Sequence, residues 1–247
     1  MSPTFSPAAV RAFAPTGVLR ACINLGNPIL ARREGEGVAG VSVDLAHELA
    51  QRLRVPCELR IVEKAAQSVE AVRTERADMG FFAIDPARSE GLCFTAPYVL
   101  IEGSYLVLQD GPLRENAQVD RSGVRVSVAS GSAYDLFLTR NLQAASIVRV
   151  PHARDVLAAL AAGQVDVAAG IRQVLEGAAC TDARLRMLPG RFMVIEQAMG
   201  LPASRGSEAA QILVRFIEAM KASGFVAEAL ARHHIEGASV APLASMN

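Results

Sequence analysis

The stretch MGFFAIDPARSEGLCFTAPY, residues 79–98, contains the pattern from which the fold is inferred. An apolar run over residues 77–84 ends close to Pro86, and Arg88 follows two residues after that proline. The chain then becomes apolar again before Pro97. A short apolar run followed by turn residues is typical of a buried strand, so a strand is predicted that ends next to a full positive charge. That arginine is either a loop residue at the surface or a functional residue.

Strands and helices alternate on the N-terminal side of this stretch. Apolar runs at 18–25 and 57–63 predict strands, and residues 41–54 and 68–76 predict helices. The first helix has apolar residues at helical spacing, namely Val43, Leu45, Ala46, Leu49, Ala50 and Leu53. Residues 26–40, rich in Gly and Asn, are predicted to form a loop. Strands that alternate with helices imply a parallel sheet covered on both faces.

A second alternation begins after residue 103. The predicted order is strand 103–109, turn-rich segment 110–123, strand 124–130, helix 132–142, strand 146–150, helix 153–163, strand 165–171, helix 172–179, strand 185–190, strand 193–202, helix 207–224 and helix 225–234. The pattern changes near residue 103 and returns near residue 197. We therefore predict two lobes, residues 1–103 with 198–247 and residues 104–197, between which the chain crosses twice.

The composition restricts the class of protein. Of the 247 residues, 51% are apolar and 20% are charged, as in a soluble globular protein with a substantial core. Lys and Arg together number 25, as do Asp and Glu, and no polybasic run occurs, so no nucleic-acid partner is expected. No apolar stretch approaches the ~18 to 20 residues of a membrane span, so direct insertion into a membrane is not expected.

The cysteines and histidines suggest neither a disulfide framework nor a metal site. Cys22, Cys57, Cys93 and Cys180 form no CxxC pair, and the first three sit inside apolar runs, so free buried thiols are predicted. A disulfide between Cys22 and Cys57 is the alternative if their strands are neighbours. The four histidines lack the spacing of metal ligands, and no metal or other cofactor is expected.

The motifs along the chain resemble those of the type II periplasmic binding proteins. The resemblance is to family 3, the solute-binding proteins that carry polar amino acids to ABC transporters. Three motifs lie in the first half of the chain: VLRACINLGNP (18–28), GVSVDLAHELAQRL (40–53) for the family's "GFDVDLAxxIAxxL", and DPARSEGLCFTAPY (85–98) for its "TxxRxxxVxFSxPY". Three more follow: VRVSVASGSAYDLFL (124–138) for its "vaVxxGSt", AAGQVDVAAG (161–170) for its "GxvDa", and QAMGLPASRGS (197–207) for its second hinge. The resemblance covers residues 17–232.

This resemblance implies an α/β fold of two Rossmann-like lobes with mainly parallel sheets, joined by two hinge strands and closing on a ligand in the cleft between them. It also implies a monomer in the periplasm that hands a small carboxylate to an ABC transporter permease. The sequence begins without the basic head and apolar segment of a secretory signal. A cytoplasmic location is therefore the alternative if Met1 is the natural start.

The resemblance also assigns residues of the first lobe to the ligand. Arg88 aligns with the arginine that holds the ligand carboxylate by a two-pronged hydrogen bond. A planar guanidinium suits a carboxylate and stays charged when it is desolvated. Ala83 stands where the family usually offers a hydroxyl to the ligand. Next to it, Phe81 or Phe82 either lines the pocket or packs in the core.

In the second lobe, Ser130, Gly131 and Ser132 match the loop that meets the same carboxylate. A hydroxyl and the backbone N–H groups of a helix start suit an anion there. Tyr134 either closes over the site or packs on its helix.

Two asparagines of the first strand complete the resemblance. Asn24 and Asn27 stand where the family has polar pocket residues. Asn27 precedes Pro28, so a role as a turn former is the alternative.

No acidic residue stands where the family's amino-acid binders pair the ligand ammonium with an Asp. Residues 170–173, GIRQ, occupy that place, and an ammonium buried without a counter-charge costs several kcal/mol. An ordinary α-amino acid bound in the ordinary way is therefore not expected. Arg172 is either a second cation for a doubly anionic ligand or a solvated residue at a helix start. Alternatively, Glu102 in the first crossing strand supplies the missing negative charge.

Three functions agree with these residues. The leading hypothesis is a solute-binding protein that docks a small carboxylate on Arg88 and then closes Ser130 and Ser132 onto it. The second is a lyase, because the same family contains cyclohexadienyl dehydratase, but no paired acid and base stand out as catalytic residues. The third is a cytosolic sensor or orphan binder without a transporter.

Overall fold

The stretch at residues 79–98 forms three short elements in the computed structural model, which describes residues 5–244. They are the strand β5 Met79–Ala83, the 3-10 helix η1 Pro86–Arg88 and the strand β6 Leu92–Phe94. All five residues of β5 are buried, and the strand has neighbours on both sides. The buried strand predicted from the apolar run is therefore confirmed.

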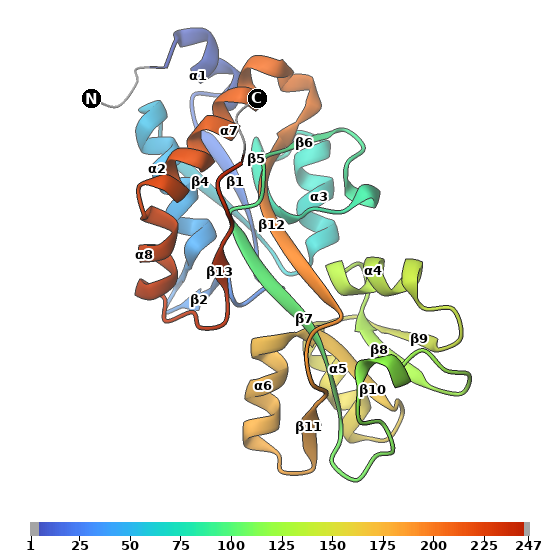
Figure 1. Cartoon of the computed structure of the whole chain (residues 1–247). Coiled ribbons are helices and arrows are strands. Elements are labelled where there is room, and N and C mark those ends of the chain that lie inside the picture. Colours follow the sequence, from blue (N-terminus) through green and yellow to red (C-terminus); the bar gives the residue numbers. More distant parts are fainter. Residues whose placement is uncertain (1–4, 245–247) are drawn as a thin grey trace. The chain divides into compact units, whose positions relative to one another are not determined.

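The chain forms two compact units. Of the described residues, unit 1 contains 5–100 and 196–244, and unit 2 contains Ile101–Ile195. The chain enters unit 2 along β7 Val99–Leu108 and leaves it along β12 Met193–Pro202 (Figure 1).

In unit 1, the strand order is β4–β1–β5–β12. The strand β1 Leu19–Asn24 runs parallel to β4 Cys57–Val62 and to β5, whereas β12 runs antiparallel to β5 and β6. The short strand β13 Ser239–Val240 pairs with the first residues of β7. The helices are α1 Pro7–Phe13, α2 Val41–Leu53, α3 Ala65–Arg73, η3 Ala203–Arg205, α7 Gly206–Ala222 and α8 Phe225–Arg232. The helix α3 covers one face of the sheet, and α2 and α8 lie on the other (Figure 1).

The helix α2 forms where the apolar pattern predicts it. All six apolar residues that are spaced for a helix in the sequence are buried. The helix begins after Gly40, whose φ of 141° lies in the region that only glycine adopts readily. A Cβ at this position would lie 2.2 Å from the carbonyl oxygen of Leu30, so a side chain does not fit.

In unit 2, the strand order is β7–β10–β8–β9. The strands β8 Arg125–Ala129, β9 Ser146–Val150 and β10 Val167–Ile171 are parallel, and β7 runs antiparallel to β10 and to β11 Leu185–Met187. The helices are η2 Asn116–Gln118, α4 Ala133–Asn141, α5 Ala153–Ala161 and α6 Arg172–Thr181. The predicted mixed α/β class with mainly parallel strands is confirmed in both units.

The structure departs from the sequence predictions mainly in short elements. Residues 26–40 contain a hairpin, β2 Arg32–Glu34 and β3 Gly37–Ala39, where a loop was expected. Each of its strands has three residues, too few to show an alternating pattern. The elements α1, η1, β6 and β13 were not predicted either, and β7 begins at Val99 rather than at residue 103.

The cysteines are free, as predicted, but only Cys22 is buried. Cys57 and Cys93 are half-buried and Cys180 is exposed, so burial was wrongly expected for them. The strands of Cys22 and Cys57 are neighbours, yet the register pairs Cys22 with Arg60, three positions away from Cys57, which explains the absence of a disulfide.

Among residues 5–244, no helix combines the length and the apolar character that crossing a membrane requires.

Candidate functional site

In unit 1, the parallel strands β1, β4 and β5 end at one edge of the sheet, which we call the carboxyl edge of unit 1. In open α/β sheets, ligands bind beyond the carboxyl ends of the strands. Asn24 is the last residue of β1, and Ala83 is the last residue of β5, with η1 and Arg88 directly after it. The sheet therefore brings these three predicted residues to the same edge.

Arg88 is almost completely buried, with 5% of its surface exposed. Its Nη1 donates a hydrogen bond to the carbonyl oxygen of Ala83 at 3.1 Å. Burial lowers the pKa of the Arg88 guanidinium, and the negative charge of Asp85 opposes that shift. A guanidinium remains protonated under such conditions, so the edge carries a fixed positive charge.

Asp85 was not predicted as a functional residue. Its side chain accepts a hydrogen bond from the backbone N–H of Ala87 at 2.9 Å and so caps the turn that carries Arg88. The residue is buried, with 4% of its surface exposed. An Asp before Pro is typical of a turn start, and this signal in the sequence marks the residue that positions Arg88.

The two phenylalanines of β5 both pack in the protein interior. Phe82 belongs to a core cluster with Cys22, Val69, Val72, Ala77 and Leu92, and its ring lies 5.5 Å from that of Phe94. Phe81 makes an edge-to-face contact with Tyr98, with ring centroids 6.1 Å apart. Of the two roles considered for Phe82, core packing is the one that the structure supports.

Asn24 and Asn27 both form turns. The Oδ1 of Asn24 accepts from the N–H of Gly26 at 2.9 Å, and the Oδ1 of Asn27 accepts from the N–H of Ile29 at 3.2 Å. Side-chain bonds to the backbone two residues onward define the Asx turn. The turn-forming role considered for Asn27 is confirmed, and Asn24 has the same role.

In unit 2, the carboxyl ends of β8 and β10 define a second edge, the carboxyl edge of unit 2. The loop Ser130–Ser132 follows β8, and Ser132 is the N-cap of α4, where its Oγ accepts from the N–H of Asp135 at 3.1 Å. The N–H groups of Ser130 and Ser132 donate to backbone carbonyls, those of Val150 and Ala129. These two N–H groups and the Ser132 hydroxyl are therefore already bonded within unit 2.

Sequence reasoning missed Asp135, which lies in the first turn of α4 next to this loop. Its Oδ2 accepts from the N–H of Gly131 at 2.8 Å, and its Oδ1 lies 3.0 Å from Nε of Arg149. A carboxylate of the protein therefore lies against the N-terminus of α4, where an anion is favoured. The spacing Ser132-x-x-Asp135 resembles a capping box and could have revealed it.

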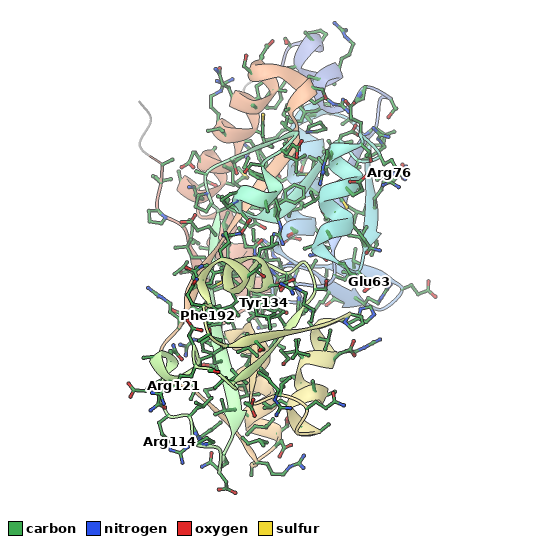
Figure 2. The ribbon with its side chains drawn as sticks, turned by 90° about the vertical axis from the view of Figure 1, so that its right-hand side faces the viewer. Glu63, Arg76, Arg114, Arg121, Tyr134 and Phe192 are labelled. Carbon is green, nitrogen blue, oxygen red and sulfur yellow. The ribbon has the colours of Figure 1, made fainter. Side chains whose placement is uncertain are left out.

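Tyr134 packs in the core of unit 2. Its side chain is at the start of α4 (Figure 2) and only 6% of the residue is exposed. Burial raises the pKa of Tyr134 to about 12, against hydrogen bonds with the Ser132 side chain and the Ala129 backbone. Of the two roles considered for Tyr134, packing is the one that the structure supports.

Glu102 and Arg172 are in direct contact. The Oε2 of Glu102 lies 2.6 Å from Nε of Arg172, and its Oε1 lies 2.6 Å from Nη1 of Arg191. The hydrogen bond from Arg191 lowers the pKa of Glu102 below its usual range; the charges of both arginines add to this, and desolvation opposes it. Arg172 also contacts Glu176 at 3.2 Å. The two residues proposed as alternative ligand contacts therefore neutralise each other, with Arg191 as an unpredicted third partner.

One groove in unit 1 does not coincide with these residues. It has a volume of about 510 Å³ and lies between β4 and α3, with Arg60, Gln67 and Arg76 among its lining residues. None of the predicted ligand-binding residues lines it. It is therefore not part of the candidate site.

Comparisons with solved structures identify the fold. A mutant of ArgBP from T. maritima matches with a TM-score of 0.76 and 19% identity, over 92% of this chain and 100% of that one. The solute receptor for L-cysteine of Neisseria gonorrhoeae matches with a TM-score of 0.76 and 22% identity, over 92% and 94%. AbpA from Streptococcus pneumoniae, an amino acid ABC transporter substrate-binding protein bound to L-arginine, matches with a TM-score of 0.75 and 19% identity, over 90% and 97%.

At these identities the solved structures establish the fold, which is that of the type II periplasmic binding proteins, as the sequence predicts. The sequence itself matches the family described as bacterial extracellular solute-binding proteins, family 3, over residues 19–235. This match spans most of the chain. The protein therefore belongs to the bacterial extracellular solute-binding proteins of family 3.

Proposed function

We propose that this protein captures an amino acid or a related small carboxylate and delivers it to an ABC importer. The observation that carries the proposal is the placement of Arg88, a buried guanidinium directly after β5 at the carboxyl edge of unit 1. Family membership supports the same role, and similar proteins of known structure include one bound to L-arginine and one described as a receptor for L-cysteine.

The proposed mechanism uses the two crossings of the chain. The ligand carboxylate docks on Arg88 in unit 1, and unit 2 then closes over it. The strands β7 and β12 are the hinges. Closure is a population shift towards the state that the ligand binds more tightly, and that state is the one that the permease recognises.

The other predicted residues contribute to the proposed site in different ways. Ser130 lies at the surface and offers a hydroxyl from the loop after β8, whereas the hydroxyl of Ser132 holds the start of α4. Ala83 contributes its carbonyl oxygen to Arg88 and no hydroxyl to the ligand. The ligand ammonium, where one is present, is met by backbone oxygens or water rather than by Glu102, because Arg172 and Arg191 bind both oxygens of that carboxylate.

The proposal includes the setting of this function. The protein acts as a monomer outside the cytoplasmic membrane, together with a permease, and it releases its ligand unchanged. No observation favours the lyase alternative, since the described part of the site contains no acid and base placed as a catalytic pair.

A thermal-shift panel on the purified protein tests the proposal. The panel contains the amino acids, their ammonium-free counterparts, dicarboxylates, keto acids and prephenate. A ligand present at a hundred times its Kd adds about 2.7 kcal/mol to the stability of the folded state, which gives a clear rise in Tm. Stabilisation by small carboxylates, with the acid recovered intact, is the expected result. Absence of stabilisation by every acid, or conversion of prephenate, would refute the proposal.

A further inference from the structure

Four side chains of unit 2, Glu102, Arg172, Glu176 and Arg191, form what we call the unit 2 charge cluster. Each carboxylate oxygen of Glu102 contacts a different guanidinium at 2.6 Å, and Arg172 contacts Glu176 at 3.2 Å. The side chains of Glu102 and Arg172 are 28% and 25% exposed. Two positive and two negative charges balance, so the cluster is electrically neutral.

The cluster lies at the carboxyl edge of unit 2. Arg172 is the first residue of α6 and follows β10 without a loop. Ile171, the last residue of β10, is opposite Gly103 of β7, so Glu102 lies just beyond the end of β10. The loop Ser130–Ser132 leaves the same edge after β8.

The backbone around the cluster fixes its members in place. The N–H of Phe192 donates to the carbonyl oxygen of Gly103 at 2.9 Å, and the ring of Phe192 stacks on that of Tyr105 with centroids 4.3 Å apart. The Nη2 of Arg172 donates to the carbonyl oxygen of Gly190 at 2.7 Å. Gly103 follows Glu102 and Phe192 follows Arg191, so the bond between Gly103 and Phe192 holds Glu102 and Arg191 close together. The ion pairs are therefore preorganised.

We infer that Glu102 is a specificity-determining residue that, together with Glu176, cancels the charges of Arg172 and Arg191. This inference rests on the proposed function. With Glu102 in place, the carboxyl edge of unit 2 presents no net charge to the part of the ligand that lies away from Arg88. The protein therefore selects carboxylates without a second negative charge. Without Glu102, the same edge carries a net positive charge and favours doubly anionic ligands.

The alternative is that the cluster only stabilises unit 2. The specificity role and the stabilising role predict different effects on ligand affinity. Loss of a contact that only stabilises unit 2 weakens the binding of all ligands alike. Loss of charge cancellation instead changes the ratio of the affinities for singly and doubly charged ligands. The ratio is therefore the quantity to measure.

The test compares the wild type with Glu102→Gln, which keeps the size of the side chain and removes its charge. Isothermal titration measures Kd for two matched pairs of probes, glutamine with glutamate and butyrate with succinate. The expected result is a shift of about tenfold or more in the Kd ratio towards glutamate and succinate in Glu102→Gln, and a smaller shift at high salt. The double variant Glu102→Gln, Arg172→Gln is expected to reverse the shift, since the cluster then again carries one positive and one negative charge.

The matched control is Asp166→Asn, which removes a carboxylate from Arg125 just before β10, at the opposite end of that strand. It is expected to leave both ratios unchanged. An unchanged ratio in a folded Glu102→Gln protein overturns the inference, and so does a failure of both the wild type and Glu102→Gln to bind glutamate or succinate. The proposed function fails separately, when the wild type is stabilised by no acid of the larger panel.

Discussion

The two units contain the same ion pair at the amino ends of their parallel strands. In unit 1, Arg20 of β1 binds Asp78, the residue before β5; in unit 2, Arg125 of β8 binds Asp166, the residue before β10. In both pairs the backbone N–H of the arginine donates to Oδ2 of the aspartate, at 2.9 Å and 2.8 Å. In both, the aspartate N–H donates back to the arginine carbonyl oxygen.

The surroundings of the two pairs differ. The side chain of Asp78 is 0% exposed and is also bound by Arg205 at 3.1 Å, whereas that of Asp166 is 39% exposed. The energetic weight of an ion pair depends on burial, because a buried charge without its partner is costly and an exposed one is solvated by water. We therefore expect the same local geometry to stabilise unit 1 substantially and unit 2 only slightly.

Breaking the buried pair should give the largest effect. Asp78→Ala leaves Arg20 and Arg205 without their central carboxylate, and loss of one partner of a buried pair costs about 3–5 kcal/mol of folding stability. Urea unfolding followed by circular dichroism measures this change. If the variant does not fold, Asp78→Asn retains the volume and should show a smaller loss. A loss below about 1 kcal/mol in both variants would contradict the contrast between the units.

A substitution at the carboxyl edge of unit 1, opposite the Arg20–Asp78 pair, should give the second largest effect. Arg88→Ala should weaken binding of any carboxylate ligand about a hundredfold or more, equivalent to about 2.8 kcal/mol, because a buried charge-assisted contact is lost. Titration calorimetry with the best acid of the panel measures the effect. The control is Arg76→Ala, an exposed arginine just after α3 (Figure 2), for which affinity should be unchanged. Undiminished affinity in a folded Arg88→Ala protein excludes this arginine from the site.

The exposed pair should contribute little. Asp166→Asn is expected to lower the free energy of unfolding by about 0.2–1 kcal/mol at low salt and by less at high salt, since solvent and ions screen the interaction. Urea unfolding at two salt concentrations measures the difference. A loss as large as that of Asp78→Ala would show that exposure does not distinguish the two pairs.

The smallest effect concerns pH. The side chain of Arg125 lowers the pKa of Asp166 below its ordinary value of 3.8, with help from the Arg125 backbone N–H and against desolvation. A carboxylate with a depressed pKa stabilises the folded state above the ordinary value, and this stabilisation is lost as the pH falls through the folded pKa. Between about pH 5 and about pH 2, wild-type stability should therefore fall slightly more than that of Asp166→Asn. Parallel curves from unfolding experiments at several pH values would contradict this assignment.

The regular elements could be predicted from the sequence where an apolar pattern is long enough. The thirteen residues of α2 contain several turns of helical spacing, and β5 is a continuous apolar run. The hairpin of β2 and β3 and the short β13 could not be predicted, because two or three residues carry no periodicity.

The candidate site was predictable only in part, for a similar reason. The apolar run predicted correctly that Arg88 follows a buried strand, but the burial of Arg88 itself depends on tertiary packing. The contact between Glu102 and Arg172 joins residues far apart in the sequence, and pairing of this kind leaves no local pattern. The sequence does not assign a single role to Phe82 or to Tyr134, because aromatic side chains occur both in protein cores and in pockets.

The exposed thiol of Cys180 can be labelled with a probe. Burial raises the pKa of Cys22 and brings that of Cys57 to about 11, so their reactive thiolate forms are scarce at neutral pH. Cys180 is exposed on α6, the helix that begins with Arg172. A maleimide fluorophore should therefore label Cys180 before Cys22 and Cys57 in the unaltered chain, without any engineered cysteine.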